Sequence, residues 1–113
     1  MSLWKVSDAK HVTLTCWALI LTERCEVHIA GYDMSAEEGR VSSALASFDV
    51  AAQTALTRRG RDYTLTGEPG LNGDALYVLE GWLALNLVPS WVDCTADVMT
   101  AGFETVVARA KPS

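Results

Sequence analysis

Three cysteines and a histidine are the residues of this chain that could together hold a metal ion. Zinc accepts three thiolates and an imidazole in a tetrahedral shell. The candidate ligands are Cys16, Cys25, His28 and Cys94. Only Cys25 and His28 are close in sequence, and residues three apart on a strand point to opposite faces. We therefore interpret the cysteines as free thiols in the core, and we expect no metal and no other cofactor.

Nucleophilic catalysis would need a cysteine or serine beside a base, and the chain has two histidines, His11 and His28. A pairing of His11 with Cys16 or Cys25 would depend on the fold, because no local motif holds the two side chains together. Pairs of carboxylates arise by chance on an acidic surface, and a general acid must also be buried. The sequence therefore predicts a protein that is not an enzyme.

Glycines recur in residues 67–73, which join a predicted strand to a predicted helix. Phosphates bind at such helix N-termini, usually with help from a basic residue. Here Glu68 lies near the start of the segment and Asp74 follows its end, and the segment contains no lysine or arginine. A turn followed by a helix N-cap explains these residues, so we do not predict a phosphate site.

The basic cluster of Arg58, Arg59 and Arg61 lies at a predicted hairpin tip close to Tyr63. Guanidinium groups can bind a phosphate backbone or an acidic partner. The formal net charge of −5 opposes nucleic acid, so contact through this turn would be weak and confined to low salt. Solvation explains the charges equally well, and the three arginines remain candidates for partner binding.

Four tryptophans are many for 113 residues. Trp17 and Trp82 fall within apolar segments that predict core positions, whereas Trp4 and Trp91 lie near the ends of predicted elements. Tryptophan is prominent in interface hot spots. Exposed Trp4 and Trp91 would favour a protein partner or self-association through a sheet edge.

Two hairpins are predicted from alternation and turn residues. Residues 12–21 and 25–30 are rich in β-branched and aliphatic side chains, which indicates a first hairpin. Residues 54–57 and 62–66 flank Gly60, which suits the positive φ of a tight turn, and predict a second hairpin.

Two interpretations are possible for the segment between the hairpins. Ser35 with Glu38 has capping-box spacing, and apolar residues follow at helical intervals, which favours one helix. Alternatively, residues 40–48 and 53–58 are strands around a turn at 49–52. We choose strands, because a long helix would conflict with the second hairpin.

The best predicted helix covers about residues 74–86, with Asn72 or Asp74 as N-cap and Asn86 in the left-handed C-terminal position. Thr95 is predicted to cap a weaker C-terminal helix.

These elements predict one globular domain over residues 1–113. The expected class is α+β, with an antiparallel, bent sheet or small open barrel of about five strands covered by the two helices. The order of hairpin, loop and tryptophan-bearing helix resembles small bacterial proteins in general and implies no activity. No segment reaches the roughly 20 apolar residues of a membrane span, and the start lacks signal-peptide features, so we expect a cytoplasmic protein.

We hypothesise a non-catalytic protein-interaction or regulatory module that binds a partner or itself. One alternative is a small-ligand-binding protein, with an apolar pocket between sheet and helix lined by Tyr63, Tyr77 and Trp82. The other is weak nucleic-acid contact through the turn at residues 58–61.

Overall fold

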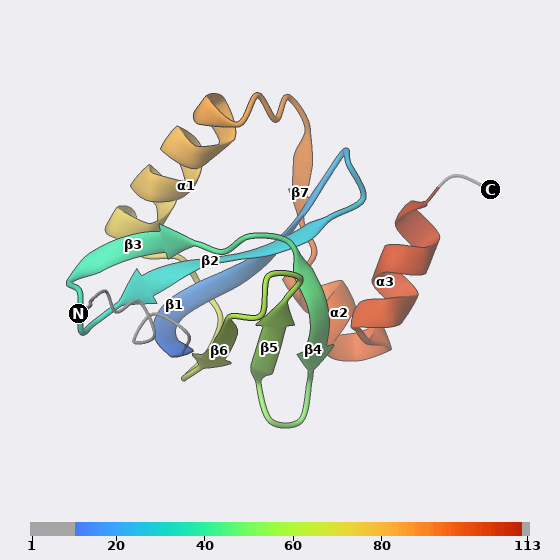
Figure 1. Cartoon of the computed structure of the whole chain (residues 1–113), viewed down its shortest axis with the longest axis horizontal. Coiled ribbons are helices and arrows are strands. Elements are labelled where there is room, and N and C mark those ends of the chain that lie inside the picture. Colours follow the sequence, from blue (N-terminus) through green and yellow to red (C-terminus); the bar gives the residue numbers. More distant parts are fainter. Residues whose placement is uncertain (1–10, 112–113) are drawn as a thin grey trace.

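The computed structural model describes residues 11–111 and has α+β architecture, with one open sheet and three helices (Figure 1). No helix in this range is long and apolar enough to cross a membrane. The strands are β1 (His11–Thr22), β2 (Val27–Asp33), β3 (Glu38–Val41), β4 (Leu45–Asp49), β5 (Thr54–Thr57), β6 (Asp62–Leu65) and β7 (Trp91–Asp93). The helices are α1 (Gly73–Leu85), α2 (Thr95–Ala101) and α3 (Phe103–Ala110).

The long strand β1 organises the sheet, whose order is β3-β2-β1-β6-β5-β4. The start of β1 pairs with β6 in parallel, and its end pairs with β7 antiparallel. A bulge lies between Thr15 and Ala18, where Cys16 has a φ of 49°, and such bulges bend a strand. The prediction of about five strands was therefore too low, because seven strands are present in the described range. The parallel β1–β6 pair also departs from the purely antiparallel sheet that was predicted.

The segment between the hairpins forms strands, as predicted. The predicted strand over residues 40–48 is, however, divided into β3 and β4. Ser42 causes the break, because its hydroxyl accepts a hydrogen bond from the Ile29 amide and donates one to the Ser43 carbonyl. After Ser42 the chain leaves β3, at one edge of the sheet, and passes to β4, at the opposite edge.

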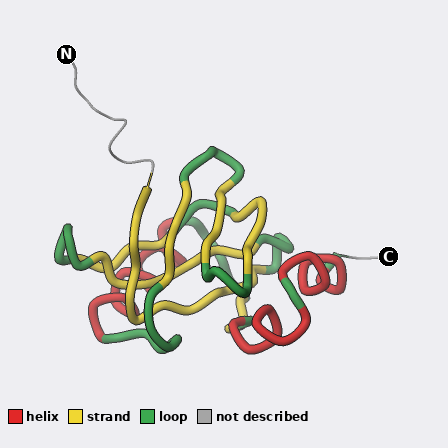
Figure 2. Tube along the Cα trace, turned by 90° about the horizontal axis from the view of Figure 1, so that it is seen from below, coloured by secondary structure: helices red, strands yellow, loops and turns green. Residues whose placement is uncertain are grey.

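Helices cover the two faces of the β1–β2 hairpin, so each face has a core of its own (Figure 2). The larger core lies under α2 and α3, where Trp17, Leu19 and Ile29 are fully buried. The smaller core lies under α1, where Ile20 and Ala30 contact the buried leucines of that helix. Alternation along β1 and β2 sends neighbouring residues into different cores.

Gly39 lets α1 approach β3. A Cβ at this position would lie 2.5 Å from the Asp74 carbonyl oxygen and 3.0 Å from the Ala75 Cα. The Asn72 side chain caps the helix by accepting a hydrogen bond from the Ala75 amide at 2.8 Å, which confirms one of the two predicted caps. The start of α1 is thereby fixed against the sheet.

The C-terminal end of α1 differs from the prediction. Leu87, with a φ of 55°, takes the left-handed position that was predicted for Asn86. The amides of Leu87 and Val88 donate to the carbonyls of Ala84 and Leu83, which is the hydrogen-bond pattern of a Schellman motif. Burial of Val88 in the smaller core favours this register, since it places an apolar residue directly after the left-handed one.

The predicted C-terminal helix is two helices, α2 and α3, separated by Gly102 with a φ of 95°. Thr95 does not cap α2 with its side chain. Its hydroxyl instead accepts a hydrogen bond from the Leu19 amide at 2.8 Å, which ties the start of α2 to β1.

Candidate functional site

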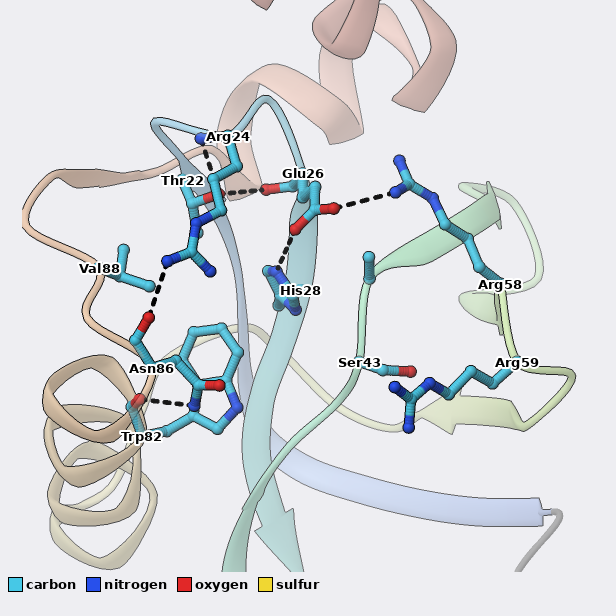
Figure 3. A pocket seen from close by; sticks show the side chains of 11 residues that line it. Thr22, Arg24, Glu26, His28, Ser43, Arg58, Arg59, Trp82, Asn86 and Val88 are labelled. Carbon is cyan, nitrogen blue, oxygen red and sulfur yellow. Dashed lines mark hydrogen bonds and ion pairs between the residues drawn. The ribbon is translucent and has the colours of Figure 1, made fainter.

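A polar cleft of about 450 Å³ lies beside the end of α1 (Figure 3). Four parts of the chain meet there: the turn between β1 and β2 with the strand ends beside it, the link between β3 and β4, the turn between β5 and β6, and the C-terminal end of α1 with the residues that follow it. The lining residues are Thr22, Arg24, Glu26, His28, Ser43, Ala44, Arg58, Arg59, Trp82, Asn86 and Val88. The cleft combines three guanidinium groups with one carboxylate, one imidazole and an aromatic wall.

His28 lies at the base of this cleft, and its side chain is only 6% exposed. Its Nδ1 lies 3.0 Å from the Ser42 carbonyl oxygen, which can only accept a hydrogen bond, so Nδ1 carries a proton. The ring packs on Trp82, with ring centroids 4.6 Å apart. Burial lowers the pKa of His28, against smaller opposing effects of the Ser42 carbonyl and Glu26. The imidazole is therefore neutral near pH 7, with a bare Nε2.

The charged side chains around His28 differ in the groups that they contact. Glu26 Oε2 lies 3.0 Å from Nη1 of Arg58, and Glu26 Oε1 lies 3.7 Å from Nε2 of His28. Arg24 donates to the carbonyl oxygens of Asn86 and Leu87, and so caps the C-terminal end of α1. Arg59 forms no ion pair with any side chain in the described range, and it extends toward Ser43 in Figure 3.

The second candidate site is an apolar surface on α1. The side of α1 that faces away from the sheet, with the segment that leads into β7, exposes large hydrophobic residues, and we call it the α1 outer surface. Its exposed members are Leu76, Tyr77, Leu85, Leu87, Trp91 and Val92. Leu85 is 83% exposed and Leu87 is 80% exposed, values near those of free side chains. Tyr77, Gly81 and Leu85 follow one another at intervals of four residues and form a row along the helix.

The structure separates the residues that the sequence singled out. Arg58, Arg59 and Trp82 come together at the polar cleft, whereas Arg61 does not line it. Tyr77 and Trp91 lie on the α1 outer surface, 79% and 37% exposed.

Two further candidates lie elsewhere. Tyr63 is buried in the larger core, so it does not share a cavity with Tyr77 and Trp82. Trp4 lies outside the described residues.

The three cysteines are free thiols. Across residues 11–111, no three histidine, cysteine, aspartate or glutamate side chains are placed to hold a metal ion. Cys94 is buried, and burial raises the pKa of its thiol to about 12, so it is protonated and unreactive. The Cys25 thiol donates to the Ala110 carbonyl oxygen.

The parallel β1–β6 pair makes a polar array that sequence patterns did not reveal. His11 contacts the Asp62 carboxylate through Nδ1, and its Nε2 lies 3.4 Å from the Thr64 hydroxyl. Both His11 and Asp62 are more than half exposed. Water therefore competes for these hydrogen bonds, and the array lacks the buried, preorganised setting that activates a nucleophile.

Sequence reasoning missed His28 and Glu26 as neighbours of the arginine turn, because that contact depends on how β2 and the β5–β6 turn pack. It also missed Leu85 and Leu87, although their position after a predicted helix stripe was a usable signal. Comparisons with protein-family models, with curated proteins and with solved structures find no match for this chain.

Proposed function

We propose that this chain is a non-catalytic protein-interaction module, and that the α1 outer surface is where it binds. The single observation behind the proposal is the character of α1. Asp74 and Glu80 are the charged residues of this helix, and apolar residues lie on both its buried and its exposed side. Both charged residues lie on the exposed side, but the other residues of that side are apolar or small, and a helix with so much apolar surface is normally covered on more than one side. The sheet covers one side of α1, so the other side fits a second protein chain.

Two residues of this surface are unfavourable for the isolated domain. Leu87 adopts the left-handed conformation, which costs a residue with a side chain roughly 1–2 kcal/mol, while its side chain is 80% exposed. Gly81 lies within α1, where glycine costs roughly 0.5–1 kcal/mol relative to alanine. A Cβ at Gly81 would meet nothing within 4 Å, so no contact inside the domain requires glycine. Both choices fit a surface shaped for a closely packed partner.

Exposed Trp91 and Val92 extend this surface onto β7. Tryptophan and tyrosine, here Trp91 and Tyr77, are enriched among the few residues that supply most of the energy in protein interfaces. The three cysteines are free, which suits a reducing compartment, and we place the module inside the cell on that ground.

The test is a comparative affinity purification from cells that express a tagged and an untagged copy of the chain. A second copy is then captured in the same way as any other partner. The baits are the wild type, Leu85→Gln with Leu87→Gly, and a control with Met34→Gln and Leu56→Gln. The control changes two exposed apolar residues outside the surface, 69% and 42% exposed.

We expect the wild type and the control to retain a stoichiometric chain that the Leu85 and Leu87 variant loses. Retention of the same proteins by all three baits would overturn the proposal. So would the absence of any stoichiometric chain from the wild-type bait.

A further inference from the structure

We propose that the polar cleft binds a small molecule in which a carboxylate lies beside a hydrogen-bond donor, as in an amino acid or a hydroxy acid. This site is separate from the α1 outer surface. The proposal follows from how hydrogen-bond donors and acceptors are distributed around the cleft of about 450 Å³, a size typical of small-ligand sites.

The acceptor side consists of His28 and Glu26. Because Nδ1 of His28 donates to the Ser42 carbonyl, the bare Nε2 can only accept a hydrogen bond. It faces Glu26 Oε1 at 3.7 Å, which is too long for a hydrogen bond, and the carboxylate has no proton to offer. The imidazole is more than nine-tenths buried. Two acceptors thus lie side by side, and a ligand N–H or O–H group placed beside both could donate to them.

The donor side consists of Arg58 and Arg59. Arg58 uses Nη1 for Glu26, which leaves other N–H groups of its guanidinium free for a ligand. Arg59 borders the same space and has no ion-pair partner in the described range. Arginine forks recognise planar carboxylates through paired N–H groups, and Arg58 already binds the carboxylate of Glu26 in this cleft.

The remaining walls suit the rest of such a ligand. Trp82 and Val88 provide an apolar side, and Asn86 and Ser43 provide polar groups. An α-amino acid would place its ammonium group beside both His28 Nε2 and the Glu26 carboxylate, its carboxylate at Arg59, and its side chain against Trp82. A hydroxy acid would use its hydroxyl in place of the ammonium.

The test is a titration of the ¹⁵N-labelled full chain with L-phenylalanine, L-alanine, lactate, acetate and inorganic phosphate, followed by the NMR shifts of His28 and of the backbone. We expect saturable binding of an amino acid or of lactate at about millimolar concentration or below. A comparison of L-alanine with lactate identifies whether the donor is an ammonium or a hydroxyl group. The His28 Nε2 resonance should move on binding, because this atom gains a hydrogen bond.

Arg59→Gln removes the free cation and should weaken binding about tenfold or more. Arg61→Gln is the matched control, since it removes the same charge from the same turn at a position that does not line the cleft. Glu26→Gln should weaken L-alanine more than lactate, because it removes the charge that faces the ammonium group.

Three results would overturn the proposal: no saturable binding of any probe, binding of acetate or phosphate as tight as that of the amino acids and lactate, or equal loss in the Arg59 and Arg61 variants. None of these measurements involves the α1 outer surface, so the two proposals succeed or fail separately.

Discussion

The two faces of the β1–β2 hairpin differ in how completely their side chains and covering helices are buried. On one face, Trp17, Leu19 and Ile29 are fully buried beneath α2 and α3. On the other face, the core beneath α1 is small, a polar cleft opens at one end of that helix, and leucines remain exposed on its outer side. The same two strands therefore carry a closed hydrophobic core and an open, chemically mixed layer.

This difference indicates that one face stabilises the domain, whereas the other face contains features that stability does not explain. Burial of large apolar side chains supplies most of the stability of a small domain, and the face under α2 and α3 contains most of it. The α1 layer contains the features that stability does not explain: the left-handed Leu87, the helical Gly81 and the Nε2 atom of His28, which accepts no hydrogen bond within the described range. Locally unfavourable features of this kind concentrate at functional sites.

The largest expected effect is in the closed core. Leu19→Ala should lower the free energy of unfolding by about 2–5 kcal/mol, because Leu19 is fully buried and its removal leaves a cavity. Leu85→Ala, on the exposed layer, should change it by less than about 0.5 kcal/mol. Urea unfolding monitored by circular dichroism gives both values. Equal losses would show that the two faces do not differ as described.

The next effect compares two glycines at α1. Gly39→Ala should destabilise the domain by about 1–3 kcal/mol, since the new Cβ would overlap the Asp74 carbonyl oxygen and the helix would have to move. Gly81→Ala should stabilise it by about 0.5–1 kcal/mol, because alanine is the better helix former and the space is open. Thermal melts of both variants check this. A destabilising Gly81→Ala would remove the argument that glycine serves a partner there.

A smaller effect concerns pH. The pKa of His28 is lowered from 6.5 in the folded chain, chiefly by burial, with Glu26, Arg58, Arg24 and the Ser42 carbonyl as its other influences. Below pH 6.5 the unfolded chain therefore binds the proton first, and the free energy of unfolding should decrease until the folded-state pKa is reached. Above pH 6.5 this contribution is constant.

His28→Gln should flatten the dependence of the free energy of unfolding on pH just below pH 6.5. Urea midpoints at several pH values measure the slopes. Identical slopes in the wild type and the His28 variant would contradict the placement of a neutral, buried imidazole.

Local patterns predicted much of the fold. Alternation predicted β1 and β2, the turn at Gly60 predicted β5 and β6, and Asn72, one of two candidate caps, predicted the start of α1. The division of residues 40–48 into β3 and β4 was not predictable, because it depends on hydrogen bonds between Ser42 and Ile29 in a different strand. The parallel β1–β6 pair likewise depends on contacts between distant segments.

The sites were predictable only in part. Exposure of Trp91 follows from its place near an element end, and the structure bears it out. The cleft joins Arg58, from the predicted hairpin tip, to Glu26 and His28, which lie about thirty residues earlier. Sequence spacing does not predict this contact, because it depends on how the bent sheet brings β2 close to the β5–β6 turn.

The most direct test of the account is one substitution, Leu87→Gly, measured in two ways on the same protein. Glycine relieves the left-handed strain, so the free energy of unfolding should rise by about 1 kcal/mol. Loss of the exposed leucine should weaken binding to the second chain by about tenfold, whether that chain is another copy or a captured partner. A rise in the free energy of unfolding together with a loss of affinity would show that Leu87 contributes to binding and lowers stability. Unchanged affinity would contradict the claim that the α1 outer surface is the binding surface of this protein.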